Sequence, residues 1–276
     1  MDGAAVEVGA SDPLWDPATL PVYHLNLPDD WETQLKDLVP TDACADRESL
    51  IGSVDYENPQ SGETEHYEDV GIRYRGHSAL FDGQRYGFKL MFDEVDDTAL
   101  FHEQKHINLQ GTEGDFTLMR ERLAREVVDD MDIAAIRAIH ARVYVNDEFL
   151  GVFPQTEEPD QQPFIDENFS KEGGSLYKVA GYCGGVATFE YKDDHPESYI
   201  KRYEPKAGTL DEAVLTDLVP LLKCAAEDDA GLEACLPNYI DVDEWLREMA
   251  VDAVLPDVDG LAGTSQNFLQ IGRAHV

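Results

Sequence analysis

The fold is decided by two stretches, YEDVGIRYR at residues 67–75 and YGFKLMF at residues 86–92. In the first, apolar and polar side chains alternate, as in a β-strand that has one face in a core, and the second is a short, mostly apolar strand pattern. The FDGQR between them is typical of a turn. Lys89 stands out because it interrupts an otherwise apolar strand. The two stretches therefore predict neighbouring strands, with charged side chains at unusual places.

The flanking sequence extends this sheet and adds one helix. Strand patterns cover residues 22–27, 107–109, 138–145 and 148–153, and the last two meet at Asn146 and Asp147, which tolerate the left-handed conformation of a tight hairpin. From residue 116 to 131 apolar residues recur at helical spacing behind Asp115, a suitable N-cap. We expect an α+β fold in which one helix packs on an antiparallel sheet.

The character of the sequence changes beyond Pro154. Helical patterns dominate at residues 163–169, 211–226 and 241–254. We therefore predict a disordered tail at 1–20, a sheet-rich part at 21–158 and a more helical part at 159–270. Residues 271–276, IGRAHV, match one reading frame of a widely used sequencing adapter, so Gln270 is expected to be the last natural residue.

The charge balance excludes several classes of function. There are 57 acidic and 21 basic residues, a net charge of −36 spread along the chain. Nucleic acid and anionic membranes are therefore not expected as partners. We find no signal peptide or membrane span, which indicates a cytoplasmic protein or a missing N-terminus. Among the cysteines, Cys224 could pair with Cys235, and Cys44 with Cys183.

One motif suggests a zinc peptidase. His102 and His106 form an HExxH sequence, which on a helix places two imidazoles one turn apart beside a glutamate base. The segment runs at once into the strand-like INLQG, however, so a surface turn is the favoured interpretation.

Several polar residues occur where structure alone would not place them: Arg73, Arg75, Lys89, Arg120, Glu121, Asp259 and Asn267. A strand lysine with a glutamate on the next helix holds nucleotide phosphates in kinases, and an aspartate followed by an asparagine supplies a base and a magnesium ligand. Taken singly, the favoured interpretation of each residue is a solvated strand charge, a helix i,i+4 pair or a polar loop.

The order of these motifs resembles the CotH family. GIRYRGHSAL and RYGFKLMFDE are similar to its two N-terminal strand motifs. KHINLQG, LMRERLAREVVDDMDIAA and ARVYVNDEFLGVFPQTEEPDQQPFIDENF resemble its N-L segment, helix and hairpin, and GSLYK, FEYKDDHPESYIKRYEPK and DVDGLAGTSQNF continue the order.

The resemblance implies a protein-kinase-like, two-lobed fold with an antiparallel-sheet N-lobe at 21–158 and a partial C-lobe at 159–270. It implies transfer of the ATP γ-phosphoryl group to serine of secreted or spore-coat-type proteins, at the cell surface or outside it. By position, Lys89 would bind phosphates and Glu121 would orient it, with Arg73 and Arg75 lining the cleft and residues 157–158 at the hinge. Asp259 would be the catalytic base and Asn267 would bind Mg²⁺.

The sequence departs from the family pattern near its end. Val258 replaces an aromatic residue, and the second metal-binding aspartate of the family would lie beyond Gln270. We therefore expect this chain to transfer phosphate poorly. A non-catalytic binding or adhesion module on the same fold is the main alternative, and the zinc peptidase is a weaker one.

Overall fold

The computed structural model describes residues 13–42, 45–76, 85–112, 114–169, 176–179, 189–207, 218–255 and 268–271. The chain divides into two compact units. The first comprises residues 1–41, 46–125 and 136–158, and the second comprises residues 42–45, 126–135 and 159–276. The mixture of helices and strands confirms the α+β class, whereas the kinase-like arrangement of two lobes stays a prediction.

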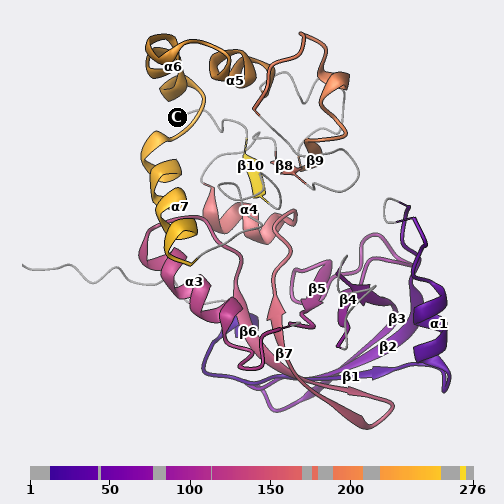
Figure 1. Cartoon of the computed structure of the whole chain (residues 1–276). Helices are drawn as coiled ribbons and strands as arrows, with labels where there is room; N and C mark the ends of the chain where they lie inside the picture. Colours follow the sequence, from indigo (N-terminus) through magenta and orange to yellow (C-terminus); the bar gives the residue numbers. More distant parts are fainter. Residues whose placement is uncertain are drawn as a thin grey trace, which may run out of the picture. The chain divides into compact units, whose positions relative to one another are not determined.

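A closed barrel of strands forms the first unit, in the order β1-β2-β3-β4-β5-β7-β6 (Figure 1). The strands are β1 (Val22–Asn26), β2 (Leu50–Glu57), β3 (Thr64–Arg75), β4 (Gly87–Met91), β5 (His106–Leu109), β6 (Ala138–Val145) and β7 (Glu148–Thr156). Strands β1 and β6 pair in parallel and close the barrel. The prediction of an antiparallel sheet is wrong at this pairing. Closure leaves no open sheet edge, so the backbone groups of β1 and β6 find partners in each other.

Alternation along the strands produces the core of the barrel. In β3, Val70, Ile72 and Tyr74 are buried, whereas Arg73 and Arg75 between and after them are only partly covered. The same period in the other strands fills the interior with large side chains, among them Tyr23, Tyr56, Leu90, Phe101, Ile107 and Phe153. The polar members of β3 and β4 therefore lie on the outer face of the barrel.

The hairpin between β6 and β7 confirms the turn predicted at Asn146 and Asp147. Both residues have positive φ, 47° and 66°. A two-residue turn with two left-handed residues matches the twist of the strands it joins. The side chain of Asn146 also accepts a hydrogen bond from the backbone N–H of Leu27, at 2.9 Å.

The helices differ in part from expectation. Helix α3 (Arg120–Asp130) is shared along the chain between the two units, and none of its residues is fully buried. Leu35 of α1 (Trp31–Asp37) is buried in the core instead. The 3-10 helix η1 (Pro13–Trp15) lies in the predicted tail, yet its Leu14 and Trp15 belong to the core.

The second unit combines a small sheet with short helices. Its strands pair in the order β10-β8-β9, with β8 (Leu176–Val179), β9 (Glu204–Ala207) and β10 (Phe268–Ile271). Its helices are α4 (Gln162–Asn168), η2 (Pro196–Ser198), α5 (Leu218–Ala225), α6 (Asp229–Cys235), η4 (Leu236–Asn238) and α7 (Val242–Val254). A disulfide joins Cys224 of α5 to Cys235 of α6, the pairing that the sequence allowed.

Candidate functional site

A row of polar residues crosses the outer face of the barrel. Arg73 of β3 lies directly opposite Lys89 of β4, Lys89 lies opposite Asn108 of β5, and Asn108 lies opposite Thr156 of β7. Because opposite residues on neighbouring strands are close together, the register alone gathers four polar side chains from four strands. Lys89 is at the centre of this row.

Glu158 provides the negative charge at the centre of the site. Its Oε2 lies 3.1 Å from Nζ of Lys89, and both side chains are nearly buried, 12% and 13% exposed. Asn108 Nδ2 donates to the same oxygen at 2.7 Å. Burial alone would raise the pKa of Glu158, but the charge of Lys89, the Asn108 hydrogen bond and the charge of Arg75 lower it to about 2. Glu158 is therefore ionised at neutral pH.

Arg75 extends this network along the sheet. Its Nε donates to Oδ1 of Asn108 at 2.8 Å, and its Nη1 donates to Oε1 of Gln110. Gln110 in turn donates to Oγ1 of Thr156 at 2.8 Å. Burial lowers the pKa of Arg75, and the charges of Glu158 and Glu121 act in the opposite direction. The guanidinium is thus held by Asn108 of β5 and by Gln110, which follows that strand.

Two further arginines add positive charge. Burial lowers the pKa of Arg73, and the charge of Arg47 lowers it further. Burial and then the charge of Arg75 lower the pKa of Arg47, whose Nη1 donates to the carbonyl oxygen of Gly76 at 2.5 Å. We call Arg47, Arg73, Arg75 and Lys89 the cation cluster. Like charges that repel one another in a partly desolvated place form a site for an anion.

Glu121 lies on the first turn of α3. Burial raises the pKa of its carboxyl, Arg75 lowers it and Asp115 raises it. Asp115 also fixes the start of the helix, because its Oδ2 accepts a hydrogen bond from the N–H of Arg120 at 3.0 Å. The predicted N-cap therefore acts on this helix, although the helix begins five residues later.

The structure brings Arg73, Arg75 and Lys89 together, as the sequence predicted, and couples Glu121 to Arg75. Asp259 and Asn267 lie outside the described residues. Sequence reasoning missed four members of the site: Arg47, Asn108, Gln110 and Glu158. Asn108 could have been found from the alternation of the INLQ segment, whereas Glu158 follows the end of β7 and has no periodic signal.

A buried ion pair supports the chain next to Glu158. The Glu157 side chain is fully buried, and its carboxylate accepts from the N–H of Arg137 at 3.2 Å, from Nε at 3.1 Å and from Nη2. The guanidinium of Arg137 also lies over the Trp15 ring, 5.2 Å from its centre. Since Glu157 is fixed by these contacts, the neighbouring Glu158 starts from a defined backbone position.

The HExxH segment has no zinc-binding geometry. His102 and Glu103 have positive φ, 46° and 67°, and Phe101 and Gln104 bracket them in a β-bridge. His102 Nε2 lies 2.8 Å from Glu65, whereas His106 Nε2 lies 2.9 Å from Asp93. The motif forms a tight turn and the start of β5 instead of one helix, so the two imidazoles do not share one helix face as a zinc peptidase needs.

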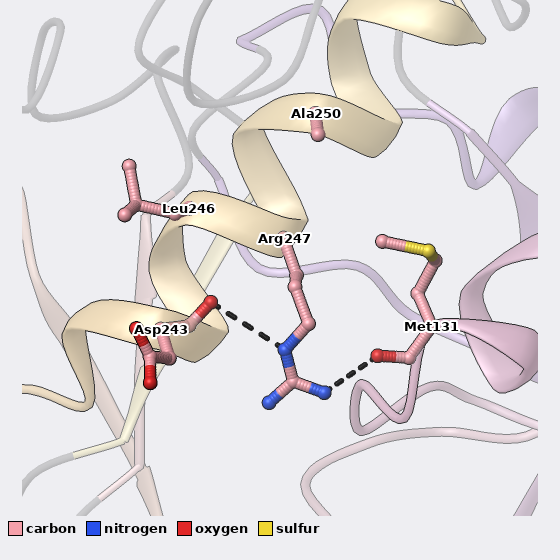
Figure 2. Close-up of a pocket in the computed structure, with 5 residues that line it drawn as sticks. All are labelled: Met131, Asp243, Leu246, Arg247 and Ala250. Carbon is pink, nitrogen blue, oxygen red and sulfur yellow. Dashed lines mark hydrogen bonds between the residues drawn. The ribbon is translucent and has the colours of Figure 1, made fainter.

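Helix α7 carries a groove with a volume of about 510 Å³. Figure 2 shows Arg247 reaching from α7 towards Met131, with its neighbours Asp243, Leu246 and Ala250 along the groove. Its Nη1 donates to the carbonyl oxygens of Met131, at 2.6 Å, and Asp132, at 2.7 Å. These carbonyls follow the end of α3, so Arg247 acts as a cap for that helix.

Among the described residues, no three His, Cys, Asp or Glu side chains form a group that could hold a metal ion. No helix that the structure describes has both the length and the apolar character needed to cross a membrane.

Fold and site together define an α+β protein whose barrel gathers Arg73, Arg75 and Lys89 on one face. The chain belongs to the CotH family, because the family model described as CotH kinase protein matches residues 72–269. Inner spore coat protein H of Bacillus subtilis (strain 168) is a relative, 24% identical over 193 residues, which are 70% of this chain and 51% of that protein. The chain thus spans about half the length of this relative, and the family named from sequence resemblance is confirmed.

Proposed function

We propose that the cation cluster binds the phosphates of ATP and that the protein is a kinase-type phosphotransferase. One observation carries the proposal: in a chain of net charge −36, three cations from neighbouring strands and Arg47 converge on one face of the barrel. Arginine and lysine donors in a partly desolvated site are the groups that bind phosphate oxygens most strongly. The family description agrees with this chemistry.

In the proposed reaction, a serine hydroxyl oxygen of a protein substrate attacks the γ-phosphorus of ATP. The new P–O bond forms as the bond from the γ-phosphorus to the bridging oxygen breaks, and that oxygen leaves with ADP. Lys89, Arg73 and Arg75 stabilise the phosphate charges. Asp259 takes the hydroxyl proton, an assignment that rests on the resemblance. The spore-coat relative supports a substrate and a location of coat or surface type.

Mg²⁺ would neutralise phosphate charge when bound with ATP. Asn267 is the residue proposed to hold it, again from the resemblance. The cation cluster suits the phosphates of the nucleotide and offers no ligand set for the metal, so no step is assigned to Mg²⁺ at this face.

The proposal is tested by calorimetric titration of the chain with ATP and with AMP. If the cluster binds phosphates, ATP binds about tenfold more tightly than AMP or better, and Lys89→Met removes most of that difference, since charge-assisted contacts to phosphate are lost. Lys36→Met is the matched control, because the Lys36 side chain is 52% exposed and pairs only loosely with Glu32, at 3.5 Å. Equal affinity for ATP and AMP, or no binding, would contradict the proposal.

A non-catalytic binding module is the alternative on the same fold. Incubation with radiolabelled ATP and candidate coat-type proteins separates the two: even slow phosphate transfer that is lost in Asp259→Ala supports the kinase, whereas the binding module predicts no transfer above that of Asp259→Ala.

A further inference from the structure

The cation cluster needs a counter-charge to hold its shape. Arg73 and Lys89 are directly opposite on paired strands, where like charges destabilise a sheet. Arg75 is two residues further along β3 on the same face and is partly buried. Without a carboxylate among them, Lys89 would move towards solvent or lose its proton, because both responses relieve repulsion in a desolvated place.

Glu158 meets this need by direct contact. It lies 3.1 Å from Lys89 and accepts a hydrogen bond from Asn108, which itself accepts from Arg75. One carboxylate thus fixes the lysine directly and the arginine through a single intervening amide. Its backbone position is set by the buried ion pair of its neighbour Glu157 with Arg137.

Glu121, the residue that the resemblance assigns to this role, has a different electrostatic partner. The cation that lowers its pKa is Arg75, and the carboxylate acts back on Arg75. Two carboxylates therefore act on two cations: Glu158 on Lys89 from the end of β7, and Glu121 on Arg75 from α3.

We propose that Glu158 is the positioning residue that holds Lys89 in its phosphate-binding orientation, a role for which Glu121 was the candidate. This inference rests on the proposed function, since it concerns the same site. A carboxylate that positions Lys89 raises ATP affinity, whereas one that competes with phosphate for Lys89 lowers it. The two effects change ATP affinity in opposite directions when the charge is removed, so a binding experiment separates them.

The first measurement is the dissociation constant for ATP at pH 7, by calorimetry, in wild type and Glu158→Gln. Glutamine keeps the size and an acceptor oxygen but removes the charge, and we expect binding about tenfold weaker, near the lower end of what one charge-assisted contact contributes. Glu32→Gln is the matched control, because Glu32 is 62% exposed in the α1 pair with Lys36. Tighter ATP binding by Glu158→Gln would identify a competitor and overturn the inference.

The second measurement asks which carboxylate acts through Lys89. In a Lys89→Met background, Glu158→Gln should cause no further loss of ATP affinity, whereas Glu121→Gln should have the same effect with or without the lysine. The reverse pattern would assign the role to Glu121 and overturn the inference while leaving the proposed function intact. No ATP binding by wild type would overturn both.

The third measurement is a pH profile, which a merely structural role would not change. Among the described residues, the charged groups near Lys89 include Arg73 and Arg75 of β3, Glu158 after β7, and, acting on those arginines, Arg47, Glu94 and Glu121. Glu158→Gln removes the carboxylate that contacts Lys89, so ATP binding should weaken at alkaline pH, beginning at a lower pH than in wild type. Lys89→Arg in the same variant should abolish this dependence, because arginine stays charged. A flat profile in Glu158→Gln would contradict the inference.

A folding control completes the design. Thermal unfolding shows whether Glu158→Gln is folded. If it is not, Glu158→Asp keeps the charge and shortens the side chain by one methylene, which breaks the 3.1 Å contact. We expect the aspartate variant to bind ATP more weakly as well. Unchanged affinity would show that direct contact between this carboxylate and Lys89 is not needed, and would overturn the inference.

Discussion

Replacing Arg137 by methionine should destabilise the first unit more than any surface substitution. The Glu157 side chain is 0% exposed, and its carboxylate accepts from Nε and Nη2 of the Arg137 guanidinium and from the backbone N–H of Arg137. The substitution removes both guanidinium donors and leaves the backbone N–H. A buried charge that loses its partner is among the most destabilising defects in a protein.

The expected loss follows from these contacts. Removing one partner of a buried ion pair costs about 3–5 kcal/mol. The cation–π contact with Trp15 adds about 0.5–1 kcal/mol, part of which methionine recovers by packing on the same ring. For comparison, Lys36→Met breaks an exposed i,i+4 pair on α1 and costs about 0.3–0.5 kcal/mol. The two substitutions should therefore differ about tenfold in free energy.

Urea unfolding followed by tryptophan fluorescence measures the difference. The chain has three tryptophans, and a Trp245→Phe background leaves only Trp15 and Trp31, which both lie in the first unit. With a slope near 2 kcal/mol per molar urea, Arg137→Met lowers the midpoint by roughly 2 M, and Lys36→Met lowers it by roughly 0.2 M.

The double variant Arg137→Met/Glu157→Leu gives the decisive comparison. If the loss comes from an unpaired buried charge, removing the second charge restores most of the stability. The reasoning is refuted if Arg137→Met costs less than about 1 kcal/mol, or if the double variant is no more stable than the single one.

Three further predictions concern other contacts. The pKa of Glu158 is about 2, below its ordinary 4.5. Its ion pair therefore stabilises the folded state above about pH 4.5, and this stabilisation is lost as the pH falls towards 2. In urea titrations, the stability difference between wild type and Glu158→Gln should narrow over that range. Reducing the disulfide between Cys224 and Cys235, which closes 11 residues, should destabilise the second unit by about 3 kcal/mol, visible as a lower melting temperature with dithiothreitol and absent in a variant with both cysteines replaced by serine. Arg247→Met removes the cation that donates to carbonyls following α3, including that of Met131. The loss should lower stability by about 1–2 kcal/mol and speed amide exchange in the last turn of α3, and unchanged exchange would contradict the capping role.

Local pattern predicted the strands well where alternation was regular. β6 has the predicted bounds, and the turn at Asn146 and Asp147 has the left-handed geometry that those side chains allow. β2 and α1 were missed because they lie in a stretch rich in Pro, Asp and Asn, where turn residues mask short elements. The parallel pairing of β1 with β6 joins segments about 120 residues apart, and no local pattern specifies such a partner.

The site was predictable only in part for the same reason. A period of two places Arg73 and Arg75 on one face of β3, so the sequence could group them. It could not show that Lys89 is opposite Arg73, because a shift of two residues would keep the face and change the partner. The contact of Lys89 with Glu158 depends on where the chain runs after β7, which follows from tertiary packing alone.

The charge of the whole chain makes the cation cluster more informative than it would be elsewhere. A net charge of −36 repels polyanions at long range, and salt screens that repulsion beyond about 8–10 Å. At contact distance, however, the field is set by the nearest groups, and here they are Lys89 and three arginines with few carboxylates. Low local dielectric strengthens those contacts, whereas water and salt screen the distant, exposed acidic residues. An acidic surface and a phosphate site are therefore compatible, provided that the cations are gathered by strand register and held together by a carboxylate such as Glu158.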